Sequence, residues 1–141
     1  MAGTNGAMGY GVPACLAAKL RYPDRLSVCF AGDGDFLMYP QELATALQYG
    51  AAVIVLVVNN GMYGTIRMHQ EARFPGRVIA TEIRNPDFVA LARACGAYAE
   101  KVETTEEFPA AFERAVAARR PALLELCVDK NQISPDRRIA D

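Results

Sequence analysis

The sequence predicts an α/β fold, a three-layer sandwich in which helices cover both faces of a mostly parallel central sheet. Short apolar runs alternate along the chain with longer amphipathic segments, which is the order expected of β-α units. The run at 52–58, AVIVLVV, has no polar alternation, so it belongs in the middle of a sheet covered on both sides. Because the 141 residues contain no repeat or linker, we expect one domain, residues 1–141.

Proline and glycine mark the elements in the first half of the chain. We predict helices at 8–20 and 39–50 and strands at 26–31 and 52–58. The first helix is entered through a glycine-rich loop, and the first strand ends in the turn GDG, residues 32–34. The second helix has Pro40 at its first position and Gly50 at its end.

The second half repeats this alternation after a segment at 65–83 that is too polar to assign. We predict helices at 85–96 and 106–119 and strands at 97–102 and 122–128, followed by a polar tail. Asn85 is the expected cap of the third helix, with Pro86 at its first position and Gly96 at its end. Pro109 leaves the start of the last helix open.

Composition excludes several classes of function. Fifteen basic and sixteen acidic residues give a net charge of −1, and no basic stripe with interleaved aromatics is present, so nucleic acid is not expected as a partner. The longest apolar run, 51–58, is far shorter than the roughly 20 residues that span a bilayer. Four separated cysteines without CxxC spacing predict reduced thiols and a cytoplasmic location.

Two consecutive strands are followed by polar residues that suit a metal ion. Asp33 follows the first strand and Asn60 the second, and the carboxyl ends of such strands are where open α/β sheets bind ligands. A carboxylate oxygen, an amide oxygen and loop carbonyls suit Mg²⁺, which also takes oxygens from substrate phosphates. The carboxylate would therefore hold a metal that holds a phosphate, while the amides of Gly34 and Asp35 bind further anionic oxygens.

The pattern GDG, then 24 residues, then NN resembles the signature of thiamine diphosphate-dependent enzymes. The segments GAMGYGVPACLAAKL, GDGDFLMYPQELATALQYG and VVNNGMYGTIRMHQ resemble the C-terminal, diphosphate-binding domain of the acetolactate synthase and benzoylformate decarboxylase group. FPGR, NPDFVALARACGA and RPALLEL extend this similarity over nearly the whole chain.

The resemblance implies a cofactor and a set of site residues. Asp33, Asn60 and the backbone carbonyl of Met62 would bind Mg²⁺, and Met8 would sit between the two rings of thiamine diphosphate. We expect Asp35, where relatives often carry Ser, to contribute its amide and to turn its side chain away from the diphosphate. The expected cofactor-binding residues are Met8, Gly32, Asp33, Gly34, Asp35, Asn60, Met62, Tyr63 and Gly64.

The resemblance also implies an activity, decarboxylation or carboligation of a small 2-oxo acid, in an enzyme of the acetolactate synthase kind. The glutamate that activates the cofactor in this family belongs to a separate domain, normally supplied by a partner subunit. We therefore expect the chain to be a C-terminal fragment of a longer homo-oligomer, a dimer or tetramer. On its own it would bind thiamine diphosphate and Mg²⁺ weakly without turnover.

Other interpretations of the same residues stay open. A binding-only diphosphate module, or a benzoylformate decarboxylase-like enzyme, fits the same motif. GYGVPA, residues 9–14, also fits the G-x-G-x-x-A pattern of dinucleotide-binding folds, but no strand precedes it and Pro13 removes an N–H from the turn. His69 and Arg67 are weaker candidates for substrate contact, and Arg73, Arg77 and Arg84 suit a solvated or subunit-facing surface.

Overall fold

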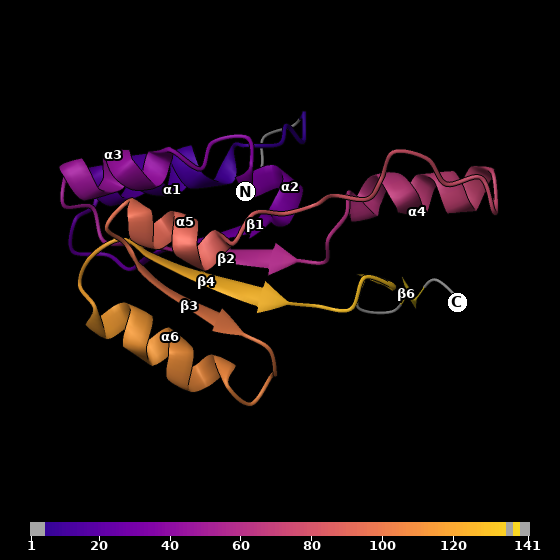
Figure 1. The fold of residues 1–141 in the computed structure, drawn as a ribbon. Coiled ribbons are helices and arrows are strands. Elements are labelled where there is room, and N and C mark those ends of the chain that lie inside the picture. The colour runs from indigo at the N-terminus through magenta and orange to yellow at the C-terminus, as the bar shows by residue number, and fades with distance from the viewer. Residues whose placement is uncertain (1–4, 135–136, 139–141) are drawn as a thin grey trace.

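A computed structural model describes residues 5–134 and 137–138, and it has the predicted α/β architecture (Figure 1). The main sheet has four parallel strands in the spatial order β1-β2-β4-β3. Their bounds are Ser27–Gly32 for β1, Val53–Asn59 for β2, Tyr98–Val102 for β3 and Ala122–Cys127 for β4. All four strands lie where the sequence predicts them, so the predicted parallel sheet is confirmed.

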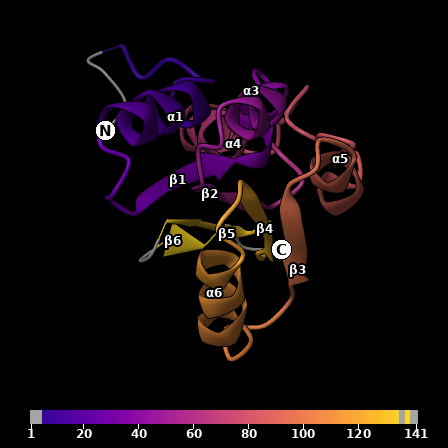
Figure 2. The same ribbon diagram turned by 90° about the vertical axis from the view of Figure 1, so that its left-hand side faces the viewer.

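Helices cover both faces of this sheet (Figure 2). One face packs against helices α1 (Gly11–Arg21), α3 (Glu42–Gln48) and α5 (Phe88–Ala94), and the other packs against α6 (Phe108–Ala117). The central strand β2 contributes Val53, Val55 and Val57 to the first core and Ile54 and Leu56 to the second. Side chains on both faces of β2 are therefore buried, as its unbroken apolar sequence predicts.

Strands β1 and β2 are direct neighbours, and this pairing positions the site. Gly32, the last residue of β1, pairs with Val58 near the end of β2. Because the two strands run parallel and in register, Asp33 and the Asn59-Asn60 pair leave the sheet at the same edge. The prediction that these two strand ends lie side by side is confirmed.

Several helix boundaries differ from the prediction. Helix α1 begins at Gly11 instead of residue 8, because Gly9 has a φ of +83° that no right-handed helix accommodates. Pro40 does not occupy the first position of α3. The i→i+3 hydrogen bonds from Glu42 N to Tyr39 O and from Leu43 N to Pro40 O form a tighter turn first, and the regular helix starts only at Glu42.

The cap of α5 is a second correction. The N-cap residue is Asp87, whose side chain accepts a hydrogen bond from Ala90 N at 2.8 Å. Asn85, the predicted cap, lies two residues outside the helix and makes other contacts, which are described below. Pro86 consequently lies outside the helix as well. Gly96 follows the C-cap residue of α5, as expected.

Four elements lie where no regular structure was predicted. The GDG turn is the start of a four-residue helix, α2 (Asp33–Phe36). The unassigned polar segment contains α4 (Gly64–Arg73), which projects from the body and buries none of its residues (Figure 1). A short antiparallel pair, β5 (Gln132–Ser134) and β6 (Arg137–Arg138), forms in the polar tail. No helix in the described part of the chain has the length and apolar character needed to cross a membrane.

Candidate cofactor and metal site

Asp33 is the centre of a hydrogen-bond network at the sheet edge. It is only 2% exposed, and it begins α2 directly after β1. Its Oδ1 accepts a bond from Gly34 N at 3.0 Å, and its Oδ2 accepts bonds from Gly61 N at 2.9 Å and Asn85 Nδ2 at 2.7 Å. A buried carboxylate needs such partners because desolvation penalises its charge. Three separate segments of the chain thus meet at one side chain.

The two asparagines after β2 have different roles in the structure. Asn59 is tied into the sheet edge, since its Nδ2 donates to Glu125 Oε1 at 2.7 Å and its Oδ1 accepts from Gly61 N at 3.1 Å. Asn60 instead shapes the loop, because its Oδ1 accepts from Met62 N at 3.1 Å. The bond from Gly61 N to Asp33 therefore fastens the asparagine loop directly to the carboxylate.

A third segment, residues 81–85, braces this loop. Tyr63 N donates to Thr81 O at 2.8 Å, and Ile83 N donates to Gly61 O at 2.9 Å, which makes a short antiparallel bridge across the loop. Asn85 ends the segment by donating to both Asp33 Oδ2 and Asn59 Oδ1, the latter at 2.9 Å. Sequence reasoning missed this brace. The only signal was the polar asparagine itself, which fitted a helix cap equally well.

A cavity of about 510 Å³ opens beside Asp33. Its walls come from the start of the described chain, from α2 and from the loop that leads into α4. The lining residues are Gly6, Ala7, Met8, Gly32, Asp33, Gly34, Asp35, Met62, Tyr63, Gly64, Thr65 and Ile66. This set contains every predicted cofactor-binding residue except Asn60. Gly6, Ala7, Thr65 and Ile66 were not predicted.

Close packing explains one glycine in this wall. A Cβ atom on Gly34 would lie 2.5 Å from Cε1 of Tyr63, so the aromatic ring rests directly against the glycine backbone. The backbone amide of Gly34, which we expected to bind an anionic oxygen of the ligand, instead donates to Asp33 Oδ1. The ring of Tyr63 consequently leaves no room for a larger side chain at position 34.

The donor atoms present fit a magnesium ion. Asp33 uses three of about four acceptor positions of a carboxylate, and Asn60 Oδ1 and Met62 O each accept one hydrogen bond. Each group thus keeps an oxygen lone pair, and hard oxygen donors of this kind suit Mg²⁺. Oδ1 of Asn85 is buried with no hydrogen-bond partner among the described residues. The described residues contain no cluster of three or more His, Cys, Asp or Glu that fits a metal, so the set rests on one carboxylate.

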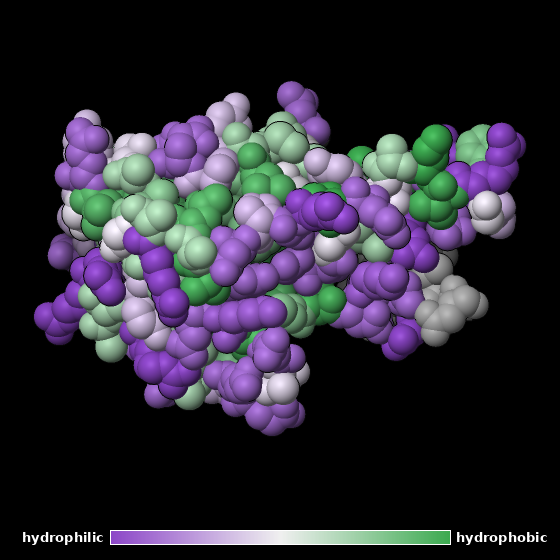
Figure 3. All heavy atoms as spheres, in the orientation of Figure 1, coloured by the Kyte–Doolittle hydropathy of each residue, from purple (hydrophilic) through white to green (hydrophobic). Residues whose placement is uncertain are grey.

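The weaker candidates do not line this cavity. His69 is exposed on this helix, whereas Arg67 contacts Met62 Sδ at 3.7 Å and Asn131 Oδ1 at 3.5 Å. Figure 3 shows apolar and polar side chains mixed along this projecting segment. Arg73, Arg77 and Arg84 are all exposed. The structure gives none of these residues a contact with Asp33.

A parallel α/β sheet whose neighbouring strand ends hold a buried carboxylate and an asparagine loop defines a domain that binds a ligand at its carboxyl edge. Residues 1–126 match the family model described as the C-terminal TPP-binding domain of thiamine pyrophosphate enzymes, and the chain belongs to this family. Thiamine pyrophosphate is the same compound as thiamine diphosphate. The family and cofactor implied by the sequence resemblance are therefore confirmed.

Within this family, the chain is similar to acetolactate synthases. The chain is 37% identical over 129 residues to the acetolactate synthase large subunit of Parasynechococcus marenigrum, covering 90% of this chain and 21% of that protein. It is 38% identical over 125 residues to the mitochondrial acetolactate synthase catalytic subunit of Saccharomyces cerevisiae, covering 89% and 18%. The chain thus spans about a fifth of the length of these curated relatives.

A solved structure gives the same fold. The thiamine diphosphate-dependent 4-hydroxybenzoylformate decarboxylase of Rhodococcus jostii superposes with a TM-score of 0.83 at 34% identity. The match covers 89% of this chain and 24% of that one. Both enzyme groups suggested by the sequence motifs are therefore present among its relatives.

Proposed function

We propose that the cavity beside Asp33 holds the diphosphate of thiamine diphosphate through a magnesium ion. The ligands are Asp33, Asn60 Oδ1 and the carbonyl oxygen of Met62. The observation that carries the proposal is the 2.9 Å bond from Gly61 N to Asp33 Oδ2, which fastens the asparagine loop to the carboxylate. A loop fixed in this way presents its oxygens without a large loss of conformational freedom on binding.

Different residues of the cavity would contact the metal ion, the diphosphate and the rest of the cofactor. Asp33 supplies the negative charge that attracts the cation, and its burial excludes water that would weaken this attraction. The cation in turn neutralises the diphosphate. Tyr63 and Gly34 form a closed wall beside the anion, and Met8 offers an apolar side chain, 41% exposed, to the rest of the cofactor. When bound, thiamine diphosphate supplies a nucleophilic carbon that adds to the carbonyl group of a 2-oxo acid.

We infer from the names of the relatives that the whole enzyme acts on a small 2-oxo acid as a carboligase or decarboxylase. We favour carboligation, the synthesis of acetolactate, because several relatives are named acetolactate synthase. The similarity to a 4-hydroxybenzoylformate decarboxylase supports decarboxylation as the alternative. The relatives are much longer than this chain, so we place the activating glutamate on another domain of a homo-oligomer. The cytoplasmic location stays a prediction, and the relative from Saccharomyces cerevisiae is named as mitochondrial.

Titration calorimetry with thiamine diphosphate tests the proposal. We expect binding in the presence of Mg²⁺, much weaker binding in its absence, and none of NAD⁺. Asp33→Ala should abolish the dependence on Mg²⁺. Asp24→Ala removes an exposed carboxylate that does not line the cavity and should leave the affinity unchanged. The assignment of the site is wrong if the affinity for thiamine diphosphate does not change when Mg²⁺ is removed or when Asp33 is substituted.

A further inference from the structure

The carboxylate of Asp35 binds the backbone of another segment of the protein, a contact that plays no direct part in binding phosphate. Its Oδ1 accepts a hydrogen bond from the backbone N–H of Gly9 at 2.5 Å, across 26 residues of sequence. Asp35 lies in α2, two residues after Asp33, and lines the same cavity. Gly9 follows residues 6–8, which also line the cavity. The bond therefore links two lining segments that are far apart in the sequence.

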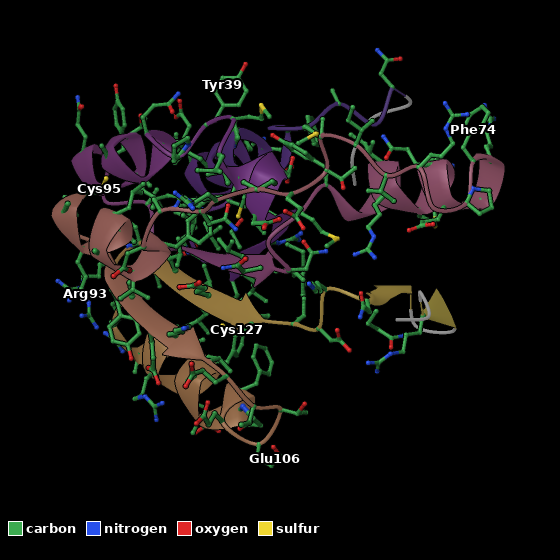
Figure 4. All side chains as sticks on the ribbon, turned by 45° about the vertical axis from the view of Figure 1, so that its right-hand side comes forward. Tyr39, Phe74, Arg93, Cys95, Glu106 and Cys127 are labelled. Carbon is green, nitrogen blue, oxygen red and sulfur yellow. The ribbon has the colours of Figure 1, made fainter. Side chains whose placement is uncertain are left out.

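Gly9 is held from its other side by close packing. A Cβ atom at this position would lie 2.4 Å from Cδ2 of Tyr39 and 2.8 Å from Cβ of Met38. Figure 4 shows Tyr39 on the outer side of the layer that α1 and α3 form. Gly9 is buried although residues 5–8 and Tyr10 are exposed. It is thus the point at which this exposed segment is attached to the domain.

The position of the Asp35 carboxylate also explains how a second acid is tolerated in an anion site. Its Oδ2 lies 3.8 Å from the place that a Cβ on Gly11 would occupy, at the start of α1. The first turn of α1 has no acidic residue and no side-chain cap of its own. The free N–H groups and the dipole of that helix end favour a nearby negative charge. That the Asp35 side chain is directed away from the diphosphate stays a prediction.

We propose that Asp35 is a positioning residue: through Gly9 N–H it holds residues 6–8, and with them Met8, against the part of the cavity that receives the rings of the cofactor. This inference rests on the proposed function, which puts the diphosphate at Asp33. The diphosphate end then touches Asp33 and the asparagine loop, whereas the remainder of the cofactor meets the Met8 wall. Loss of the Asp35 bond should weaken contacts with the rings and spare those with the diphosphate.

Two ligands separate these effects. Thiamine diphosphate and inorganic diphosphate, each with Mg²⁺, are titrated into the purified chain, and the ratio of their Kd values is compared among variants. Removing the Asp35 charge affects the two ligands unequally, because thiamine diphosphate also carries a cationic thiazolium ring. Asp35→Asn lacks the same charge, so its comparison with Asp35→Ala isolates the effect of the lost acceptor. Asp35→Ala loses the acceptor, whereas Asp35→Asn keeps an oxygen that can accept from Gly9. Asp87→Ala is the matched control, since it removes a carboxylate that accepts a single backbone N–H at α5.

We expect Asp35→Ala to weaken thiamine diphosphate binding about tenfold relative to inorganic diphosphate, the size of effect for one lost hydrogen bond to a charged group. Asp87→Ala should keep the wild-type ratio, and Asp35→Asn should stay much closer to it than Asp35→Ala does. Exchange of the Gly9 amide, followed by NMR without any ligand, should become about tenfold faster in Asp35→Ala and should recover in Asp35→Asn. If Asp35→Ala does not fold, Asp35→Ser replaces it, because its hydroxyl stands one bond short of the carboxylate oxygen.

The two possible failures are distinct. A wild-type chain that binds neither ligand in the presence of Mg²⁺ contradicts the proposed function and the inference with it. A chain that binds both ligands, but whose Kd ratio is unaltered in Asp35→Ala, contradicts the inference alone. An Asp35→Asn variant with the same altered ratio as Asp35→Ala would also overturn it, because the acceptor oxygen would then be irrelevant.

Discussion

The side-chain amide of Asn85 donates to Oδ2 of Asp33 at 2.7 Å, although 52 residues separate them in the sequence. The same amide also donates to Asn59 Oδ1, so one side chain links the ends of β1 and β2. A metal ligand that is oriented by a neighbouring hydrogen bond binds its ion more tightly, because the ligand does not have to be ordered on binding. Asn85 therefore supports the proposed metal ligand Asp33 without lining the cavity.

Asn85→Ala should lower the affinity for Mg²⁺. Asp33 would lose one of its three hydrogen bonds, and outer-shell changes of this kind typically cost about 10–100-fold in metal affinity. The measurement is a Mg²⁺ titration at a fixed concentration of thiamine diphosphate. Pro86→Ala, at the exposed next residue, is the control and should bind as the wild type does. Unchanged Mg²⁺ affinity in Asn85→Ala would show that Asp33 needs no such support.

Gly34→Ala should weaken cofactor binding by displacing Tyr63. The new Cβ atom would lie 2.5 Å from the tyrosine ring, which is too close for any real contact. A double-mutant cycle with Tyr63→Ala tests whether the clash with the ring causes the loss of affinity, because removal of the ring also removes the clash. We expect the Gly34 substitution to cost much less affinity in the Tyr63→Ala background. An equal loss of cofactor affinity in both backgrounds would show that Gly34→Ala does not act through Tyr63.

Phe88→Ala should destabilise the domain and the site together. Phe88 is fully buried and packs edge-on against Phe36 of α2, with ring centroids 5.5 Å apart. Removing such a ring typically lowers the free energy of unfolding by about 3–5 kcal/mol. Urea denaturation measures this loss. Phe30→Ala, at a side chain that is 71% exposed, should change it by less than about 0.5 kcal/mol, and similar losses in both variants would contradict the packing.

The stability of the chain should fall with rising pH in alkali, in part because of Cys29. Burial is the largest cause that raises the pKa of this thiol, from 9.0 to about 12, and nearby Cys15 and Asp35 add to the shift. The unfolded chain therefore loses this proton first, and the free energy of unfolding falls between pH 9 and pH 12 by up to about 1.4 kcal/mol per pH unit. Urea denaturation at pH 8, 9 and 10 should give a shallower fall for Cys29→Ala than for the wild type. Identical slopes would contradict the raised pKa.

The sheet was predictable because its residues carry their own signal. Val53 to Val58 form an unbroken apolar run, and a strand covered on both faces buries the first five of these side chains. Asp33 and Asn60 were predictable as site candidates for a related reason. Each follows a predicted strand, and parallel strands bring their carboxyl ends to one edge.

The brace around the site was not predictable in the same way. Asn85 and Thr81 act through bonds to residues about 20 or more positions away, and no local pattern marks such partners. Helix α4 was missed because it buries none of its residues and its sequence, GTIRMHQEAR, contains few apolar side chains. Asp35 was expected to turn away from the diphosphate, but its bond to Gly9 depends on a loop conformation that the sequence does not specify.

The most direct test is a crystal structure of the chain with thiamine diphosphate and Mn²⁺ in place of Mg²⁺, because manganese gives an anomalous signal that locates the ion. The account predicts one peak within about 2.2 Å of an Asp33 oxygen, Asn60 Oδ1 and Met62 O, with the diphosphate completing the coordination. An ion at any other place, or a diphosphate bound with no ion between it and the carboxylate of residue 33, would contradict it.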